Sequence, residues 1–303
     1  MNIAELSNVS KVYKKKRAVS HLNMTVEKGD IFGFIGRNGA GKSTTLKMIC
    51  GLAAPSEGEI RLFGKPVTND TARRRTGMLI ENAGIYPGFC AKENLMLKAR
   101  CLGIVDAEQR VKELLSFTGL EDAGSKKTKQ FSMGMKQRLG IAMALLGTPD
   151  LLILDEPING LDPEGIQEIR RMLLHLNEEQ DITIIISSHI LGELSKIATR
   201  YGIIKDGQMI QQIRSEELEQ KCQSCLVAKV EDAKAASVLL EEKMNLTDYE
   251  VRPDGEIRIY APCEPQFLNS VFAENQVAVG EVYYRHQDLE SYFLKLMGGD
   301  DND

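Results

Sequence analysis

A glycine-rich segment at residues 36–44 carries the residue types that bind a polyphosphate. It reads GRNGAGKST, follows the apolar run Ile31–Ile35 and precedes apolar residues at helical spacing. Backbone N–H groups can wrap a triphosphate only where no side chain holds the backbone away, which explains glycine at Gly39 and Gly41. A chance glycine turn is the alternative, but the filled motif and its context favour a phosphate-binding loop between a strand and a helix.

Three polar residues at the end of this loop have predicted roles. Lys42 is assigned to the β- and γ-phosphates, the Ser43 hydroxyl to Mg²⁺ and Thr44 to a further phosphate contact. The start of the following helix adds unpaired N–H donors and a positive dipole end, which also favour phosphate. The predicted nucleotide-binding residues of the loop are Gly36, Asn38, Gly39, Gly41, Lys42, Ser43 and Thr44.

Two carboxylates, Asp155 and Glu156, follow the short apolar run Leu151–Leu154. Such a run is typical of a strand buried on both faces of a parallel sheet, and ligands bind at the carboxyl ends of these strands. Asp155 is predicted to hold Mg²⁺ directly or through water, and Glu156 to orient or deprotonate an attacking water. The alternative is a solvated loop after a strand.

Two further side chains could contact the nucleotide. His189 ends the strand after the carboxylates, so its imidazole could donate a hydrogen bond to the γ-phosphate. Tyr13 lies in the first predicted turn, where its ring could stack on a purine. A purely structural role is the alternative for each.

Short strands and helices alternate around these motifs. Strands are predicted at 3–12, 18–26, 31–35, 78–80 and 182–186, hairpins at 58–67 and 201–213, and helices at 93–102, 108–117, from 131–138 onwards and after the turn at 159–163. Residues 1–214 are therefore predicted to form an α/β domain.

Residues 215–303 are predicted to form a second, small α+β domain. Its elements are strands at 226–230 and 277–284, a hairpin at 249–261 turning at Asp254 and Gly255, and helices at 233–243, 265–273 and 289–297. No catalytic constellation is found in it. Packing, dimer support or regulation is the expected role, partner binding through the last helix is the alternative, and the tail at 300–303 is expected to be disordered.

The distribution of charge and the length of the apolar runs limit the classes of protein to which this chain can belong. The net charge is −5, but residues 215–303 hold 8 Lys and Arg against 19 Asp and Glu, while residues 1–214 hold 30 against 24. An acidic second domain argues against nucleic acid as the main partner. No apolar run approaches the roughly 18 residues of a membrane span, and no signal core follows the first residues, so a cytosolic location is expected.

Six cysteines are scattered along the chain, which favours reduced, mostly buried thiols in the cytosol. Cys222 and Cys225 have pair spacing. A zinc site would need two further ligands, for which Cys263 and His286 are the nearest candidates, so ordinary packing is the favoured interpretation.

The order of motifs resembles that of the ATP-binding cassette (ABC) family of transport ATPases over residues 1–214. The phosphate loop comes first, then a signature segment at 132–137, the dicarboxylate, a turn at 159–162 and the switch residue His189. The resemblance implies a phosphate-loop NTPase core with an N-terminal β-rich subdomain and a helical subdomain at about 86–147. It also implies ATP and Mg²⁺ as ligands.

The resemblance further implies a head-to-tail dimer that holds each ATP between the phosphate loop of one copy and the signature segment of the other. Ser132 and the N–H of Gly134 would close on the γ-phosphate, and Asp162 would contact the opposite site. A homodimer or a paired cassette subunit is therefore an expected partner.

Two departures from the family pattern affect the site. Glu81 stands where Gln is usual; a carboxylate there should bind Mg²⁺ more strongly but adds negative charge beside the γ-phosphate. Met133 and Met135 replace the usual Gly and Gln of the signature, so the family's side-chain contacts are not carried over to those two positions.

Segments at 77–82, 187–194 and 288–299 are similar to ATP-binding subunits of bacterial peptide-resistance exporters of the lantibiotic-immunity and bacitracin type. This similarity implies an ATPase that lies at the inner face of the cell membrane and drives a separate permease, with residues 81–94 as the contact face. The rival hypotheses are a soluble cassette ATPase that acts on ribosomes or DNA, and a nucleotide-sensing regulator with little turnover.

Overall fold

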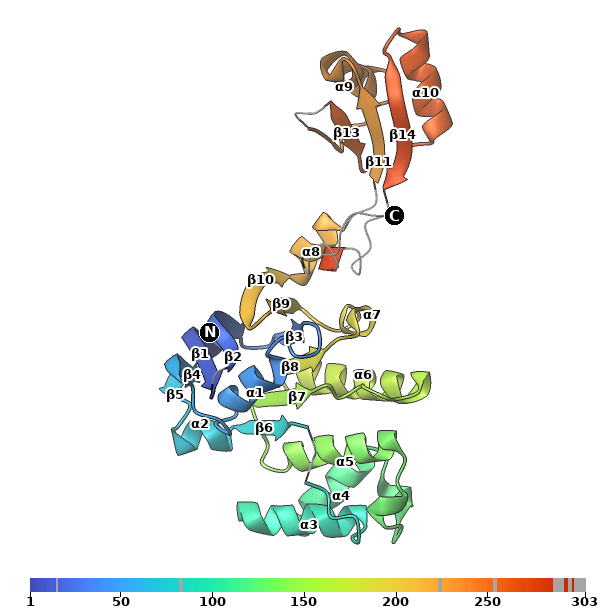
Figure 1. Cartoon of the computed structure of the whole chain (residues 1–303). Helices are drawn as coiled ribbons and strands as arrows, with labels where there is room; N and C mark the ends of the chain where they lie inside the picture. Colours follow the sequence, from blue (N-terminus) through green and yellow to red (C-terminus); the bar gives the residue numbers. More distant parts are fainter. Residues whose placement is uncertain are drawn as a thin grey trace. The chain divides into compact units, whose positions relative to one another are not determined.

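The computed structural model describes residues 1–14, 16–81, 84–222, 225–252, 255–285, 292–293 and 296. The chain divides into two compact units, residues 1–215 and 216–303. Figure 1 shows the elements of each unit.

The strands of the first unit form two sheets. They are β1 (Asn2–Tyr13), β2 (Lys16–Glu27), β3 (Ile31–Ile35), β4 (Glu57–Leu62), β5 (Lys65–Pro66), β6 (Thr76–Leu79), β7 (Leu151–Asp155), β8 (Thr183–Ser188), β9 (Arg200–Lys205) and β10 (Gln208–Arg214). One sheet has the order β10-β9-β3-β8-β7-β6, and the other has the order β2-β1-β4-β5.

The helices of this unit connect the strands. They are α1 (Lys42–Ile49), α2 (Asp70–Arg74), α3 (Ala91–Leu102), α4 (Ala107–Phe117), α5 (Met133–Leu145), α6 (Pro163–Glu178) and α7 (Leu191–Leu194), with short 3₁₀ turns at Glu121–Ala123 and Thr128–Gln130. The helices α3, α4 and α5 pack against one another (Figure 1).

Parallel pairing of β3, β8, β7 and β6 brings the ends of these strands to one edge of the larger sheet. Every residue of β3 and β7 is buried, as expected for strands covered on both faces. The phosphate loop follows β3, and the carboxylates lie at the end of β7. The predicted meeting of these motifs at one sheet edge is therefore confirmed.

The predicted elements of the first unit are confirmed, with shifts at their ends. Strand β8 runs from Thr183 to Ser188, two residues past the predicted end, because its final residues stay paired with β3 and β7. Strand β6 ends at Leu79, so Glu81 lies two residues beyond it. One buried cluster contains residues of both sheets together with Leu46, Met48 and Ile49 of α1.

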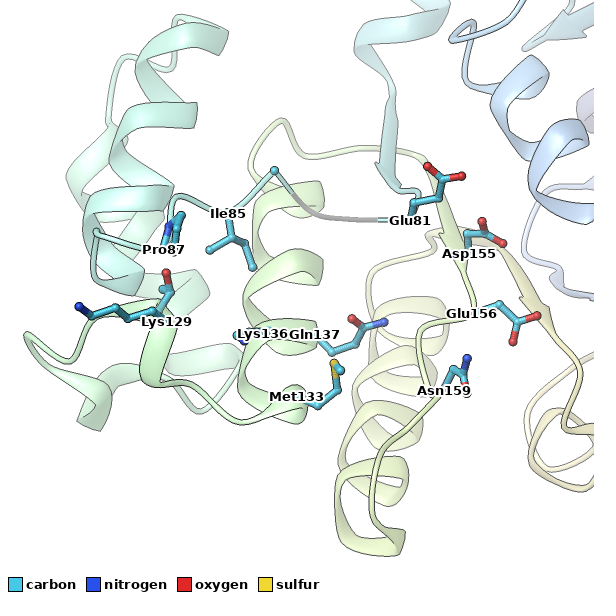
Figure 2. A pocket seen from close by; sticks show the side chains of 12 residues that line it. Glu81, Ile85, Pro87, Lys129, Met133, Lys136, Gln137, Asp155, Glu156 and Asn159 are labelled. Atoms are coloured by element: carbon cyan, nitrogen blue, oxygen red, sulfur yellow. The ribbon is translucent and has the colours of Figure 1, made fainter.

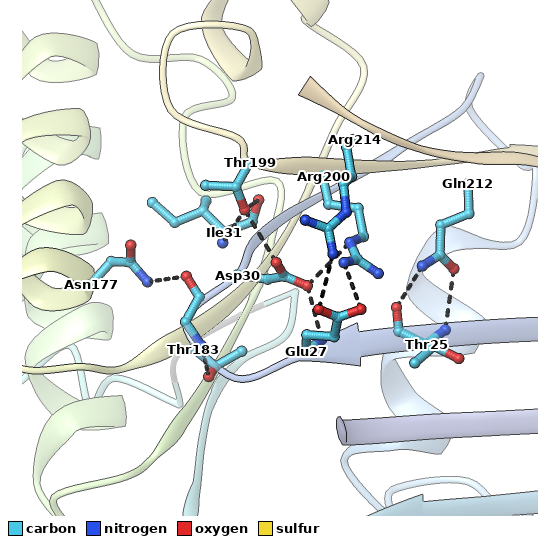
Figure 3. A network of polar contacts seen from close by, with 11 residues as sticks. Thr25, Glu27, Asp30, Ile31, Asn177, Thr183, Thr199, Arg200, Gln212 and Arg214 are labelled. Atoms are coloured by element: carbon cyan, nitrogen blue, oxygen red, sulfur yellow. Dashed lines mark hydrogen bonds and ion pairs between the residues drawn. The ribbon is translucent and has the colours of Figure 1, made fainter. Parts of the chain in front are cut away.

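An ion-pair network joins β2, the turn before β3, β9 and β10 (Figure 3). The buried guanidinium of Arg200 lies 2.7 Å from Oε1 of Glu27 and 3.3 Å from Oδ2 of Asp30. Arg214, which is exposed, reaches the second oxygen of Glu27 at 3.2 Å. The arginine therefore bridges two carboxylates from segments that are far from it in the sequence.

We expect Arg200→Met to lower the free energy of unfolding by about 3 kcal/mol, because it leaves Glu27 and Asp30 without their shared buried partner. Arg214→Met is the matched control and should cost less than about 1 kcal/mol, since its side chain is 57% exposed. Urea unfolding of both variants measures the difference; equal losses would contradict this account of the network.

In its described residues the second unit forms a four-stranded antiparallel sheet, accompanied by the helices α9 and α10. Its elements are β11 (Cys225–Val230), α9 (Ala233–Glu242), β12 (Tyr249–Val251), β13 (Glu256–Ile259), α10 (Pro265–Glu274) and β14 (Val279–Arg285), and α8 (Ser215–Lys221) precedes them. The strand order is β12-β13-β11-β14. Leu226, Leu240 and Phe272 belong to its buried core.

These elements confirm the predicted α+β pattern, although α8 was not predicted. The last strand begins at Val279 rather than at residue 277. The turn residue Asp254, the proposed zinc ligand His286 and the tail lie outside the described residues, as does most of the predicted helix at 289–297. In the described part of the chain, no group of three or more His, Cys, Asp or Glu could hold a metal ion, and no helix could span a bilayer.

Candidate active site

The phosphate loop has a backbone that only glycine adopts easily. Gly39 and Gly41 have φ angles of 82° and 110°, in the left-handed region that side chains disfavour. At Gly41 and Gly36 an added Cβ would also meet backbone oxygen atoms at 2.8 and 2.5 Å. The loop is therefore held close to its neighbours and leads directly into α1, whose first residue is Lys42.

The side chain of Lys42 lies along the inside of this loop. Its Nζ donates a hydrogen bond to the Gly36 carbonyl at 2.6 Å and lies 3.2 Å from Oε1 of Glu156. The side chain is only 6% exposed. The loop and the dicarboxylate, which are more than a hundred residues apart in the sequence, thus meet through this ammonium group.

The two carboxylates differ in their surroundings. Asp155 is buried, and its Oδ1 accepts a 2.6 Å hydrogen bond from the Ser187 hydroxyl. Glu156 is partly exposed, and its backbone adopts a φ of 50°. A buried, oriented carboxylate suits metal binding, whereas a more exposed one can reach a water molecule.

Glu156 also contacts His189, the predicted switch residue. Nδ1 of His189 lies 2.7 Å from Oε2 of Glu156, while Lys42 contacts the other oxygen. Both oxygens of the carboxylate are therefore engaged by groups that the sequence assigned to the phosphates.

A pocket of about 590 Å³ lies over the phosphate loop. Its lining contains Tyr13, Asn38, Gly39, Gly41, Lys42, Ser43, Thr44 and Glu156. Tyr13 is 46% exposed, and the ammonium of Lys11 lies 5.0 Å from the centre of its ring. The structure thus brings the predicted purine-stacking residue and the loop to one cavity.

A second pocket, of about 700 Å³, adjoins the carboxylates (Figure 2). Glu81, Asp155, Glu156 and Asn159 line one side, and Met133 and Gln137 of the signature helix α5 lie across from them (Figure 2). Glu156 and Asn159 belong to both pockets.

The comparisons with known proteins agree with this geometry. The ABC transporter family model matches residues 19–159. The bacitracin transport ATP-binding protein BcrA of Bacillus licheniformis is 43% identical over 300 residues, which cover 98% of each chain. This chain belongs to the ABC transporter family. The resemblance inferred from the order of motifs is confirmed.

Two further proteins similar to this ABC protein match a smaller part of it. The lantibiotic transport ATP-binding protein SrtF of Streptococcus pyogenes is 41% identical over 206 residues, covering 68% of this chain and 88% of that protein. The ATP-binding cassette MJ0796, solved as a dimer in a post-hydrolysis state with ADP and Pi, has a TM-score of 0.65 and 27% identity, and the match covers 70% of this chain and 99% of that one. The ABC protein described here binds ATP and is an ATPase.

The residues of this ABC ATPase that are predicted to contact the nucleotide of a second copy do not line the pocket over their own phosphate loop. Ser132 caps α5 by accepting a hydrogen bond from the Met135 N–H at 3.2 Å, and Asp162 caps α6 in the same way through Gly165. Ser132 and Asp162 are exposed, and neither they nor Gly134 line either pocket. The structure of one protomer therefore does not bring them to the nucleotide pocket.

Glu81, the departure from the family pattern, forms an ion pair with Lys47 of α1. The distance from Nζ to Oε1 is 2.5 Å. The hydrogen bond to Glu81 raises the pKa of the Lys47 ammonium. The ammonium group of Lys47 thus balances the negative charge of Glu81 within the same protomer.

Sequence reasoning missed Lys47, Asn159 and Ser187. Lys47 and Ser187 lie within a few residues of a recognised motif and Asn159 begins the recognised turn at 159–162, but none of the three was assigned a role at the site. Burial raises the pKa of the nearby Cys50 thiol to about 12, with a smaller effect from the Asp155 carboxylate. The prediction of mostly buried thiols holds for Cys50, Cys90 and Cys225, which are buried, whereas Cys101 is exposed.

Proposed function

We propose that this ABC ATPase dimerises around ATP and drives a separate membrane permease that exports an antimicrobial peptide. The observation that carries this proposal is the similarity to the bacitracin transport protein over both structural units. In this function the protein is cytoplasmic and attaches to the inner face of the cell membrane through the permease.

Residues that line the first pocket, together with Gly36 and His189 beside them, supply the chemistry. Lys42 contacts the β- and γ-phosphates, and the N–H groups of the loop between Gly36 and Thr44 surround them. Glu156 orients the attacking water and accepts its proton, while His189 donates to the γ-phosphate. The contacts at 2.7 and 3.2 Å from Glu156 to His189 and Lys42 support these roles, because all three groups converge on one point.

The oxygen donors in the site fit Mg²⁺, which prefers carboxylate and hydroxyl ligands. Asp155 and Ser43 are the proposed ligands, and Asp155 has one oxygen hydrogen-bonded to Ser187, which fixes the other. Glu81 is the third proposed contact and would have to exchange its bond to Lys47 for one to the ion. When bound, the ion neutralises charge on the phosphate oxygens.

Residues outside both pockets complete the site of a second copy in this proposal. Ser132, Gly134 and Asp162 lie at or near helix N-termini, where N–H groups favour anionic ligands. Ser132 and Asp162 are exposed and Gly134 is half-buried, which leaves this surface open to a partner's nucleotide. ATP then holds two copies together, and hydrolysis releases them.

An exposed aromatic pair supports the proposed permease contact within residues 81–94. Residues 82 and 83 of this segment lie outside the described residues. Tyr86 and Phe89 are 55% and 40% exposed, and their ring centres are 5.6 Å apart. We expect the double variant Tyr86→Ala/Phe89→Ala to weaken permease binding at least about tenfold while basal ATPase activity stays within about twofold. Pull-down with detergent-solubilised permease, beside ATPase assays, measures both; Leu52→Ala, a 57% exposed apolar residue, is the control.

Co-purification tests the function as a whole. Capture of a membrane protein that raises the ATPase rate supports transport. Co-sedimentation with ribosomes, or salt-sensitive DNA binding, would instead support a soluble cassette ATPase. A wild-type rate near zero with and without the permease, restored by Glu81→Gln, would favour the nucleotide-sensing regulator.

A further inference from the structure

Ser187 is the residue from which we draw a further inference. It is the penultimate residue of β8, is completely buried and stands directly opposite Asp155 in the parallel pairing of β7 and β8. Its Oγ lies 2.6 Å from Oδ1 of Asp155 and 2.9 Å from the backbone N of Glu156. One hydroxyl group therefore contacts both residues of the dicarboxylate.

The chemistry of the two partners fixes the direction of both hydrogen bonds. The Glu156 N–H can only donate, so the hydroxyl oxygen accepts there. The hydroxyl has a single hydrogen, which must then be donated to the Asp155 carboxylate. In the part of the chain that the structure describes, no other side chain donates a hydrogen bond to that carboxylate. The carboxylate plane of Asp155 is thus set by one group.

The second bond of Ser187 acts on the backbone of Glu156. That residue has a φ of 50°, which non-glycine residues disfavour, and its N–H also lies 3.2 Å from the Ser187 carbonyl oxygen. These contacts hold the turn after β7 in the conformation that directs the Glu156 side chain toward Lys42 and His189.

We infer that Ser187 is a positioning residue for ATP hydrolysis, which orients Asp155 toward the divalent cation and Glu156 toward the water. The inference rests on the proposed roles of these two carboxylates. It predicts that loss of the hydroxyl impairs cation binding and turnover, whereas nucleotide affinity without a divalent cation is unchanged.

The test uses Mn²⁺, which shares the oxygen preference of Mg²⁺ and is detected by electron paramagnetic resonance. For Ser187→Ala in the presence of ADP, we expect Mn²⁺ affinity to fall about tenfold, as for the loss of one hydrogen bond to a charged group. The Mg²⁺ concentration for half-maximal ATPase activity should rise by a similar factor, and kcat should fall. Ser187→Cys keeps the shape of the side chain with a larger sulfur that donates weakly, so it should behave like Ser187→Ala. Ser187→Thr keeps the hydroxyl and should retain wild-type cation affinity.

A purely structural role gives a different result. Thr183→Val removes another fully buried hydroxyl at the opposite end of β8, where it accepts a hydrogen bond from the Gly29 N–H at 3.1 Å. This control should lower the melting temperature without changing cation affinity. If Ser187→Cys folds and binds Mn²⁺ like the wild type while Asp155→Asn does not, the inference about Ser187 is wrong and the metal site stands. If Asp155→Asn also binds Mn²⁺ with wild-type affinity, the proposed role of Asp155 as a cation ligand is wrong.

Discussion

The Glu156→Gln variant should lose steady-state ATPase activity by about 100- to 10,000-fold, the range for removal of a general base. The amide cannot accept the proton of the attacking water, but it keeps the size of the carboxylate and its capacity to accept a hydrogen bond from His189, 2.7 Å away in the wild type. ATP should still bind. Because hydrolysis normally releases the dimer, the variant should accumulate as an ATP-bound dimer.

Two measurements check this expectation. A phosphate-release assay gives the rate, and size-exclusion chromatography with Mg-ATP gives the oligomeric state. Glu164→Gln, at an exposed position in the first turn of α6, is the control and should leave both unchanged. A Glu156→Gln protein that turns over at the wild-type rate would show that another group is the base.

The Lys42→Met variant should lose nucleotide binding itself. Removing one partner from a buried, hydrogen-bonded charge pair costs about 2–5 kcal/mol, which is about 30-fold to several thousand-fold in affinity. The wild-type ammonium is 6% exposed, bonds to the Gly36 carbonyl at 2.6 Å and lies 3.2 Å from Glu156. Methionine fills the same space, so the change tests the charge rather than the packing.

Binding of a fluorescent ATP analogue by equilibrium titration measures this loss. Lys112→Met, on the exposed face of α4 and outside both pockets, is the matched control and should bind normally. The two variants should also separate the steps of the reaction. Lys42→Met should reduce affinity, whereas Glu156→Gln should reduce turnover with affinity retained; the reverse pattern would contradict the assigned roles.

Much of the fold was predictable because its signals are local. The apolar runs at 31–35 and 151–154 are too short and too continuous for surface helices, and both are fully buried strands of the parallel sheet. Gly39 and Gly41 mark the phosphate loop because their backbone conformations exclude most side chains. The turn before Asp162 and Pro163 likewise marks the start of α6.

The contacts across the sheet edge were not predictable in the same way. Ser187 bonds to Asp155 only because β7 and β8 pair in one particular register, and a shift of one residue would turn either side chain to the other face. Glu81 was recognised from the family pattern, but its ion pair with Lys47 of α1 could not be predicted, because Lys47 belongs to no motif. Their roles depend on pairing over distances of 30 residues or more.

The sequence by itself determined the class of chemistry, since the order of phosphate loop, signature, dicarboxylate and histidine occurs in these residues alone. The tertiary structure decided which of these motifs meet within one protomer and which do not. It joins the loop to Glu156 and His189 within one protomer, and it leaves Ser132 and Asp162 exposed outside the pocket. The physical reason is that parallel strands bring their carboxyl ends together, whereas the signature begins a helix that packs with α3 and α4.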